Sequence, residues 1–243
     1  MGRTLALLYG AVCYLIFFVT FLYAIGFVGD LVVPKTIDSG TAGSFGQALL
    51  INVLLLGIFA VQHSVMARPA FKRWWTQFVP QAVERSTYVL LSSLALILLY
   101  WQWQPMNGVV WDVENIAGRN LLWAIFFIGW VMVLVSTFLI NHFDLFGLRQ
   151  VYLYMKAKEY THIAFRTPFL YKFVRHPIML GFIIAFWVTP HMTVAHLVFS
   201  IATTAYILIA LQFEERDLVS YYGTAYEEYR QQVSMILPFP KKK

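Results

Sequence analysis

The sequence contains few charged residues for its length. Only 12% of its 243 residues are Asp, Glu, Lys or Arg, whereas a soluble globular domain averages about 25%. A chain with so little charge cannot cover a water-facing surface of its own size. The composition therefore excludes an ordinary cytosolic enzyme, a disordered protein and a nucleic-acid-binding module, although the formal net charge is +6.

Cysteine is nearly absent as well. Cys13 is the single cysteine and lies in an apolar run, so no disulfide can form within the chain. The lack of a CxxC pair argues against a zinc site or a thiol redox site, and we expect no bound metal. The sequence also has no internal repeat to divide it. We therefore expect one membrane-embedded domain over residues 1–243.

Apolar residues make up 60% of the chain. A membrane-crossing helix needs about 20 mostly apolar residues, and the segments that provide them are 5–28, 46–66, 86–103, 120–141 and 192–213. A shorter apolar segment, 178–189, would be about 18 Å long as a helix and cannot cross the bilayer. Pro190 separates it from the last span. The predicted fold is an all-α integral membrane protein with about five transmembrane helices, a C-terminal helical hairpin with one partial leg, and an amphipathic cytoplasmic tail.

The loops between these spans differ in charge. Two of them, 67–85 and 142–177, are rich in Lys and Arg, whereas the other two are slightly negative. Positively charged loops remain on the cytoplasmic side of a membrane. We therefore expect an inner-membrane protein whose N-terminus and C-terminus both face the cytoplasm. The lysines at 241–243 are expected to bind anionic lipid.

Polar residues gather at the predicted cytoplasmic ends of the spans. They form four groups: Gln62, His63 and Ser64; Asn141 and His142; Arg175, His176 and Pro177; Glu214, Glu215, Arg216 and Asp217. Polar groups at membrane depth are costly and are usually functional, so we expect the active site on this side. The alternative is that these helix ends are simply in contact with water.

The tripeptide Arg175-His176-Pro177 has the form of a helix start. Proline fits the first helical position because its missing N–H is not needed there, so His176 would be the N-cap. A helix N-terminus favours a carboxylate or phosphate ligand. Gly181, four residues after Pro177, would let a flat ligand approach the backbone. The alternative is that Gly181 packs against another helix.

Two further pairs could contact a ligand. Glu214 and Glu215 are about 100° apart on a helix, so at most one faces a given pocket, where it could hold a cation. Tyr226 and Tyr229 share a helix face and could line an adenine pocket or face a cation. The alternatives are a solvated charge network around Arg216 and a tail that rests on the membrane.

These motifs together resemble a known family. The R-H-P-x-x-x-G motif at 175–181, the Glu-Glu pair and G-x-x-Y-x-x-Y-R at 223–230 resemble the C-terminal module of isoprenylcysteine carboxyl methyltransferases, to which phospholipid N-methyltransferases are similar. The segment 62–68, Gln-His-Ser-x-Met-Ala-Arg, and the segment from Tyr171 to Pro177 resemble the branch with methanethiol S-methyltransferases and NnrU-type membrane proteins. The resemblance covers roughly residues 50–240. Met179 stands where the family often has tyrosine, so we assign that position no polar role.

The resemblance implies a cofactor. S-adenosylmethionine would be the methyl donor, bound on the cytoplasmic side and released as S-adenosylhomocysteine. Its carboxylate would lie at Arg175 and His176, and its ammonium at Glu214 or Glu215. The residues expected to enclose the adenosine are Leu180, Gly181, Tyr226 and Tyr229, with Tyr154 as a weaker candidate, and Pro177 belongs to the same cofactor site. Residues 1–144 would form an N-terminal four-helix part and residues 145–243 the module that binds S-adenosylmethionine.

The same resemblance implies a small thiol as the acceptor. Methanethiol would be converted to dimethyl sulfide, and hydrogen sulfide is a further candidate acceptor. A thiol must lose its proton, so His63 and His142 are the candidate bases. Asn141 would orient His142 or the acceptor.

Other functions remain open at this point. The acceptor could instead be an isoprenylcysteine or a lipid. His63 and His142 could also be the axial ligands of a bis-histidine haem. A sterol reductase that binds a dinucleotide has a similar C-terminus, and a structural role without catalysis is a further alternative.

Overall fold

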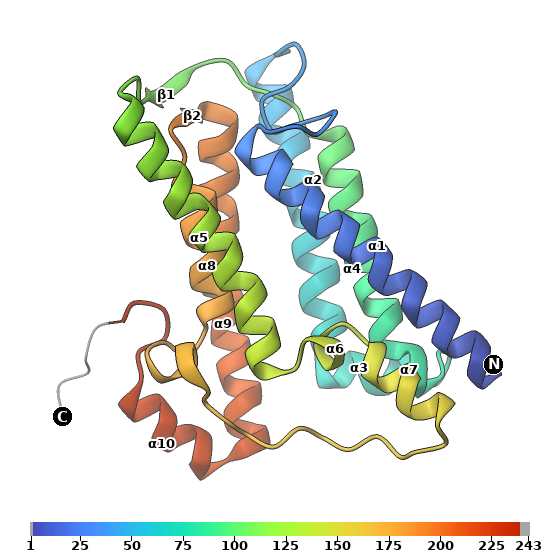
Figure 1. The fold of residues 1–243 in the computed structure, drawn as a ribbon. Helices are drawn as coiled ribbons and strands as arrows, with labels where there is room; N and C mark the ends of the chain where they lie inside the picture. The colour runs from blue at the N-terminus through green and yellow to red at the C-terminus, as the bar shows by residue number, and fades with distance from the viewer. Residues whose placement is uncertain (1, 239–243) are drawn as a thin grey trace. The chain divides into compact units, whose positions relative to one another are not determined.

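The computed structural model describes residues 2–238, and most of them are helical. The helices in this range that are long and apolar enough to cross a membrane are α1 (Arg3–Gly29), α2 (Phe45–Ala67), α4 (Gln81–Gln102), α5 (Ile116–Ile140) and α9 (Val194–Tyr222) (Figure 1). The predicted all-α membrane fold is therefore confirmed. The lysines at 241–243, for which we predicted lipid binding, lie outside the described residues.

The predicted hairpin with a partial leg is also present. Its first leg, α8 (Pro177–Trp187), has 11 residues and is about 16 Å long, too short to cross a bilayer. Between α8 and α9 lies β2 (His191–Thr193), which pairs antiparallel with β1 (Val109–Asp112). We did not predict this two-stranded sheet. Its strands are short and far apart in sequence, so no turn signal joins them.

Close packing divides the chain into two compact units. Unit 1 consists of Met1–Gly108 and His142–His162, and unit 2 consists of Val109–Asn141 and Ile163–Lys243. Helix α5 thus packs with the C-terminal hairpin, whereas the segment that follows it packs against α1 and α4 through α7. The functional boundary at residue 144 stays a prediction. It differs from the boundaries of the compact units, because each unit contains residues from both sides of it.

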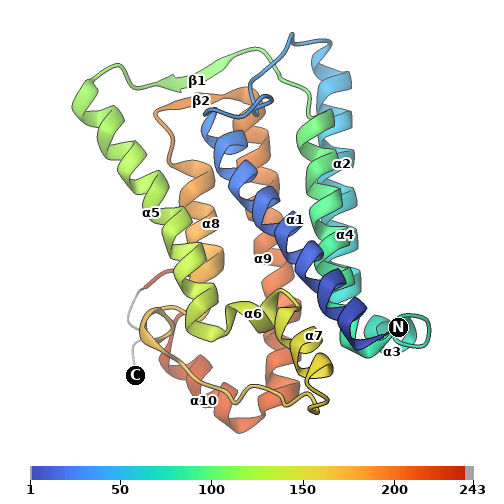
Figure 2. The ribbon, with the colours of Figure 1, turned by 45° about the vertical axis from the view of Figure 1, so that its right-hand side comes forward.

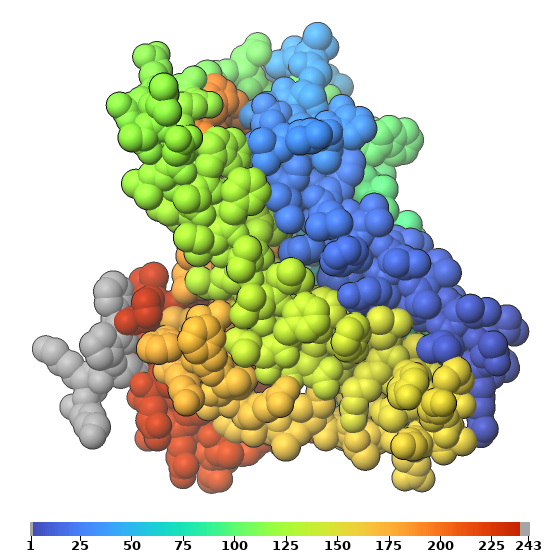
Figure 3. All heavy atoms as spheres, in the orientation of Figure 1, coloured from blue at the N-terminus to red at the C-terminus, as the bar shows by residue number. Residues whose placement is uncertain are grey.

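In unit 1, three short helices accompany α1, α2 and α4. They are α3 (Pro69–Trp75), α6 (His142–Leu145) and α7 (Leu148–Met155). Helix α7 packs against the N-terminal turns of α1, as the yellow and dark blue atoms of Figure 3 show. Gly10 permits this approach, because a Cβ atom there would lie 2.6 Å from Val151 Cγ2. Val151 is fully buried with Ala6 and Val83 in a small core.

In unit 2, α5 and α8 lie side by side (Figure 2). Two glycines allow the two backbones to touch. A Cβ atom on Gly129 would lie 2.8 Å from the carbonyl oxygen of Gly181, and one on Gly181 would lie 2.7 Å from that of Gly129. The expectation that Gly181 leaves space for a flat ligand is therefore wrong, because α5 fills that space. The alternative, helix packing through small residues, is what the structure shows.

The C-terminal part of unit 2 differs from the expectation in one respect. The predicted span ends at residue 213 with Glu214 and Glu215 at its end, but the helix that contains them, α9, continues to Tyr222. Hydropathy marks where the apolar span ends and does not show where the helix itself ends. After Gly223, α10 (Thr224–Gln232) turns back toward η1 (Phe169–Lys172) and the start of α8.

Candidate active site

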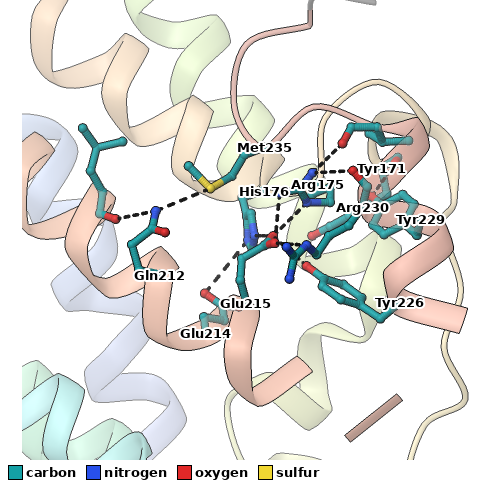
Figure 4. A network of polar contacts seen from close by, with 12 residues as sticks. Tyr171, Arg175, His176, Gln212, Glu214, Glu215, Tyr226, Tyr229, Arg230 and Met235 are labelled. Atoms are coloured by element: carbon teal, nitrogen blue, oxygen red, sulfur yellow. Dashed lines mark hydrogen bonds and ion pairs between the residues drawn. The ribbon is translucent and has the colours of Figure 1, made fainter. Parts of the chain in front are cut away.

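A buried ion pair between Arg175 and Glu215 forms the centre of the polar network in unit 2 (Figure 4). Arg175 Nε lies 2.8 Å from Glu215 Oε1, and Arg175 Nη2 lies 2.9 Å from Oε2. The two side chains are 7% and 9% exposed. Parallel N–H···O bonds of this kind are the strongest geometry available to arginine and a carboxylate. The pair joins the segment just before α8 to the C-terminal part of α9.

Three more side chains surround the Glu215 carboxylate. His176 Nε2 lies 2.8 Å from Oε1, and the Tyr226 hydroxyl donates to the same oxygen at 2.8 Å. Arg230 Nε lies 3.5 Å from Oε2. A buried carboxylate needs such partners, since the loss of hydration is otherwise not offset. Glu215 is thus held by groups of the chain itself.

The segment after α10 is fastened to the start of α8. Arg175 Nη1 donates to the carbonyl oxygen of Val233 at 2.5 Å. The backbone N–H groups of Arg175 and His176 donate to the carbonyl oxygens of Ser234 and Met235 at 2.9 and 3.1 Å. Arg175 and Val233 are 58 positions apart in the sequence. The orientation of the Arg175-His176-Pro177 turn therefore depends on a distant segment of the chain.

Tyr226 and Tyr229 cover this ion pair from α10. They are only 2% and 9% exposed, and the Phe165 ring lies 5.7 and 5.5 Å from their ring centroids. The Tyr229 hydroxyl donates to the carbonyl oxygen of Tyr171 at 2.5 Å. Burial raises the pKa of both phenols, so they stay protonated and act as donors. Their rings offer little open surface to a ligand.

Glu214 differs from its neighbour because it faces outward. Its side chain is 45% exposed, and its Oε2 lies 4.0 Å from His176 Nδ1. His176 is the N-cap of α8, as predicted, and its side chain does not cap the helix. Pro177 is buried at the first helical position, and Leu180 is half-buried one turn on. An open carboxylate thus lies near a helix start whose first N–H groups have no side-chain cap.

His63 lies in unit 1, near the end of α2. Its Nδ1 is 3.2 Å from Ser92 Oγ, and the Tyr88 hydroxyl is 3.0 Å from each ring nitrogen. The ring stacks on Phe59 at 5.2 Å between centroids. Gln62, the preceding residue, has a buried Oε1 without a hydrogen-bond partner in the described part of the chain. The histidine is therefore held by neutral donors and acceptors.

His142 also belongs to unit 1, at the start of α6. It is 2% exposed, and its Nε2 lies 2.8 Å from the Tyr14 hydroxyl. The rings of Phe146 and Phe143 lie 4.9 and 5.5 Å from its centroid. Burial lowers the pKa of His142, so its ring is neutral near pH 7. The preceding residue, Asn141, caps α5 and is assigned to unit 2.

The structure thus brings together most, but not all, of the predicted site residues. Six of them gather in unit 2, as Figure 4 shows: Arg175, His176, Glu214, Glu215, Tyr226 and Tyr229. Pro177 follows His176 at the start of α8. In contrast, His63, His142 and Tyr154 belong to unit 1. Tyr154 lies on α7, where the Arg3 guanidinium is 6.0 Å from its ring centroid.

The structure places several further residues in contact with these side chains, and we had predicted no role for them. Arg230 and Tyr171 stand inside the quoted motifs, at the end of G-x-x-Y-x-x-Y-R and at the start of the segment 171–177, and that position was the available signal. Tyr14 and Tyr88 lie in apolar spans among many other aromatic residues. Nothing in the pattern distinguishes them.

These features define a helical membrane protein with a charged, internally paired site in its C-terminal unit. The family described as NnrU protein matches residues 50–236 of the chain. The chain belongs to this family. No solved structure matches it.

The relatives narrow the class further. A methanethiol S-methyltransferase of Mycobacterium tuberculosis is 62% identical over 100% of this chain and 99% of its own length. One of Crocosphaera subtropica is 57% identical, over 100% and 95%. Nurim of Mus musculus is 26% identical over 69% of this chain and 66% of its own length. Through its full-length relatives the chain is an enzyme of the methyltransferase class.

Proposed function

We propose that the chain transfers the methyl group of S-adenosylmethionine to methanethiol. The carbon–sulfur bond to the sulfonium breaks as a new carbon–sulfur bond forms to the thiol, which loses its proton. The products are dimethyl sulfide and S-adenosylhomocysteine. The observation that carries this proposal is the similarity, at 62% identity along the whole chain, to a methanethiol S-methyltransferase.

The residues of unit 2 fit the donor. S-adenosylmethionine carries an ammonium and a carboxylate side by side. Glu214 is the open acid of the pair, so we assign the ammonium to it, and the carboxylate to the start of α8 and to the Arg230 guanidinium, whose side chain is 47% exposed. Glu215 already faces two arginines, so its role is to hold Arg175 and His176 in position rather than to bind the ligand.

The acceptor needs a base and a dry site. A thiol is a weak nucleophile until it loses its proton, and a buried, neutral imidazole can accept that proton. His142 is neutral near pH 7 because burial lowers its pKa, and His63 is the second candidate. Methyl transfer is an in-line displacement, so alignment and exclusion of water supply most of the remaining rate.

We also propose the orientation. The loops that carry α3 and the segment 142–177 are basic, as are the residues around the start of α8. The positive-inside rule therefore favours a cytoplasmic location for both termini and for the donor site. A soluble donor such as S-adenosylmethionine would be available on that side.

The haem hypothesis finds less support. An axial ligand must bond iron directly through a ring nitrogen, whereas a base can receive its proton through a hydrogen-bonded hydroxyl or water. In this structure Nε2 of His142 is hydrogen-bonded to Tyr14, and both nitrogens of His63 face the Tyr88 hydroxyl.

The proposal is tested with membranes that contain the chain. They are supplied with S-adenosylmethionine and methanethiol, and dimethyl sulfide is measured in the headspace. We expect product that depends on both compounds and is absent from membranes without the chain. No product, together with no calorimetric binding of S-adenosylhomocysteine to the purified protein, would refute the proposal. Binding without dimethyl sulfide would direct the search to isoprenylcysteine or lipid acceptors.

A further inference from the structure

A groove of about 610 Å³ runs between α1 and α4 in unit 1, two helices that lie side by side in Figure 2. The residues that define it include Leu15, Val19 and Tyr23 of α1, Ile97 and Trp101 of α4, and Lys35 of the loop after α1. Its volume falls in the range of about 300–1,000 Å³ that is typical of ligand sites. None of the residues proposed for methyl transfer lines it.

The walls of the groove present hydrocarbon. The polar groups along it are satisfied within the chain: Thr20 Oγ1 donates to the carbonyl oxygen of Ile16 at 2.7 Å, and the Tyr23 hydroxyl donates to that of Lys35 at 3.0 Å. Leu15 and Val19 are 60% and 62% exposed. Both walls are helices of membrane-crossing length, so an apolar chain is the occupant that the groove can accept.

One end of the groove carries a cation. Lys35 Nζ donates to the carbonyl oxygen of Trp101 at 2.6 Å. An ammonium has three donors, so two remain for a ligand. Within residues 2–238 no carboxylate forms an ion pair with Lys35. A negatively charged group beside the apolar groove would complete this arrangement.

Aromatic residues mark the depth of this end. Trp101 is 69% exposed, and Tyr23 stacks on Tyr100 with 5.3 Å between centroids. Tyrosine and tryptophan rings concentrate at the level of lipid headgroups, and Lys35 lies in the loop just beyond α1. The cation is therefore at the height of lipid phosphates, while the groove extends from it along the span.

We propose that this groove binds an anionic phospholipid such as phosphatidylglycerol. One acyl chain lies along Leu15, Val19 and Ile97, and the phosphate accepts hydrogen bonds from Lys35 Nζ. The site is independent of the methyltransferase activity proposed above. It lies in the membrane leaflet that contains the C-terminal end of α1.

Native mass spectrometry of the purified protein in an equal mixture of phosphatidylglycerol and phosphatidylcholine tests the headgroup contact. Lys35→Gln should reduce the preference for phosphatidylglycerol by about fivefold, since one lysine near a lipid surface contributes about that factor. The matched control is Lys158→Gln, an exposed lysine of unit 1 outside the groove, which should keep the preference. An equal change in both variants, or in neither, overturns the proposal in favour of annular lipid only.

A second variant tests the groove itself. Val19→Trp fills the apolar wall and should remove the most tightly held lipid, whereas Val61→Trp, at an exposed position of α2 outside the groove, should retain it. Soluble glycerol phosphate should not compete, because it lacks the acyl chain. Retention of lipid by Val19→Trp, or displacement by glycerol phosphate, would contradict the proposal even if the lysine variant behaves as expected.

Discussion

The two compact units satisfy their buried polar groups in different ways. In unit 2 a buried carboxylate, Glu215, is held by the cations of Arg175 and Arg230. In unit 1 the buried polar side chains form neutral hydrogen bonds, as His142 does with Tyr14 and as Asn52 does with the backbone of Gln104 at 2.8 Å. A charged network suits the recognition of a charged donor, and a neutral one suits the handling of a proton.

The two arrangements also differ in how they respond to substitution. Removing one partner of a buried ion pair leaves an uncompensated charge in an apolar environment, which costs about 3–5 kcal/mol. Removing one neutral hydrogen bond costs only about 0.5–1.5 kcal/mol.

The largest effect is expected for Glu215→Ala. It leaves the Arg175 guanidinium buried without its carboxylate and should lower the free energy of unfolding by about 3–5 kcal/mol. Thermal unfolding of the purified protein in detergent measures the loss. The matched control is Glu214→Ala, whose carboxylate is 45% exposed and whose removal should leave stability near the wild type. Equal melting temperatures for the two variants would contradict the account.

A smaller effect is expected at the contact between α5 and α8. The Cβ atom of Gly129→Ala would lie 2.8 Å from the backbone nitrogen of Ala185, so the helices must separate, at a cost of about 1–3 kcal/mol. Gly57→Ala in α2 of unit 1 has no atom within 4 Å of the new Cβ and should be neutral or slightly stabilising, since alanine favours the helix. Thermal unfolding compares the two variants. If Gly129→Ala is as stable as the unchanged chain, the close approach of α5 and α8 is not required.

The neutral state of His142 predicts a pH dependence. Burial lowers its pKa in the folded protein, so below about pH 6.5 the unfolded chain binds a proton that the folded chain does not. Stability should therefore rise with pH between the folded pKa and about 6.5. His142→Gln should flatten this part of the stability–pH profile from pH 5 to 7.5. An unchanged slope would show that another titrating group causes the pH dependence of stability.

The smallest structural effect is expected for Tyr88→Phe. It removes the hydroxyl next to both ring nitrogens of His63 and should cost about 0.5–1.5 kcal/mol. If His63 assists proton removal, turnover should fall while the affinity for S-adenosylhomocysteine stays unchanged. Tyr152→Phe, on a half-exposed residue of α7, is the control for the substitution itself. A fall in affinity for Tyr88→Phe would give the tyrosine a different role.

The sequence predicted those features that depend on local pattern. Hydropathy predicted the five spans and the short leg α8. The preference of proline for the first helical position placed His176 at the N-cap of α8. The 100° rotation between Glu214 and Glu215 implied that only one could face a given pocket, but not that Glu215 would be the one to face inward.

Features that depend on packing could not be predicted in the same way. The close contact at Gly181 requires knowledge of α5 as its neighbour, and the pairing of β1 with β2 joins residues such as Trp111 and Met192, which are far apart in the sequence. The tyrosines that contact His63 and His142 come from other helices. A single sequence does not contain these distances, so only the structure could identify these partners.

Calorimetric titration with S-adenosylhomocysteine tests directly whether unit 2 binds the donor while unit 1 accepts the proton. The account predicts that Glu214→Gln weakens binding by about tenfold, the value of one charged hydrogen bond, and that His63→Gln binds as tightly as the unchanged chain. Equal affinities for Glu214→Gln and the unchanged chain, or weak binding by His63→Gln, would contradict it.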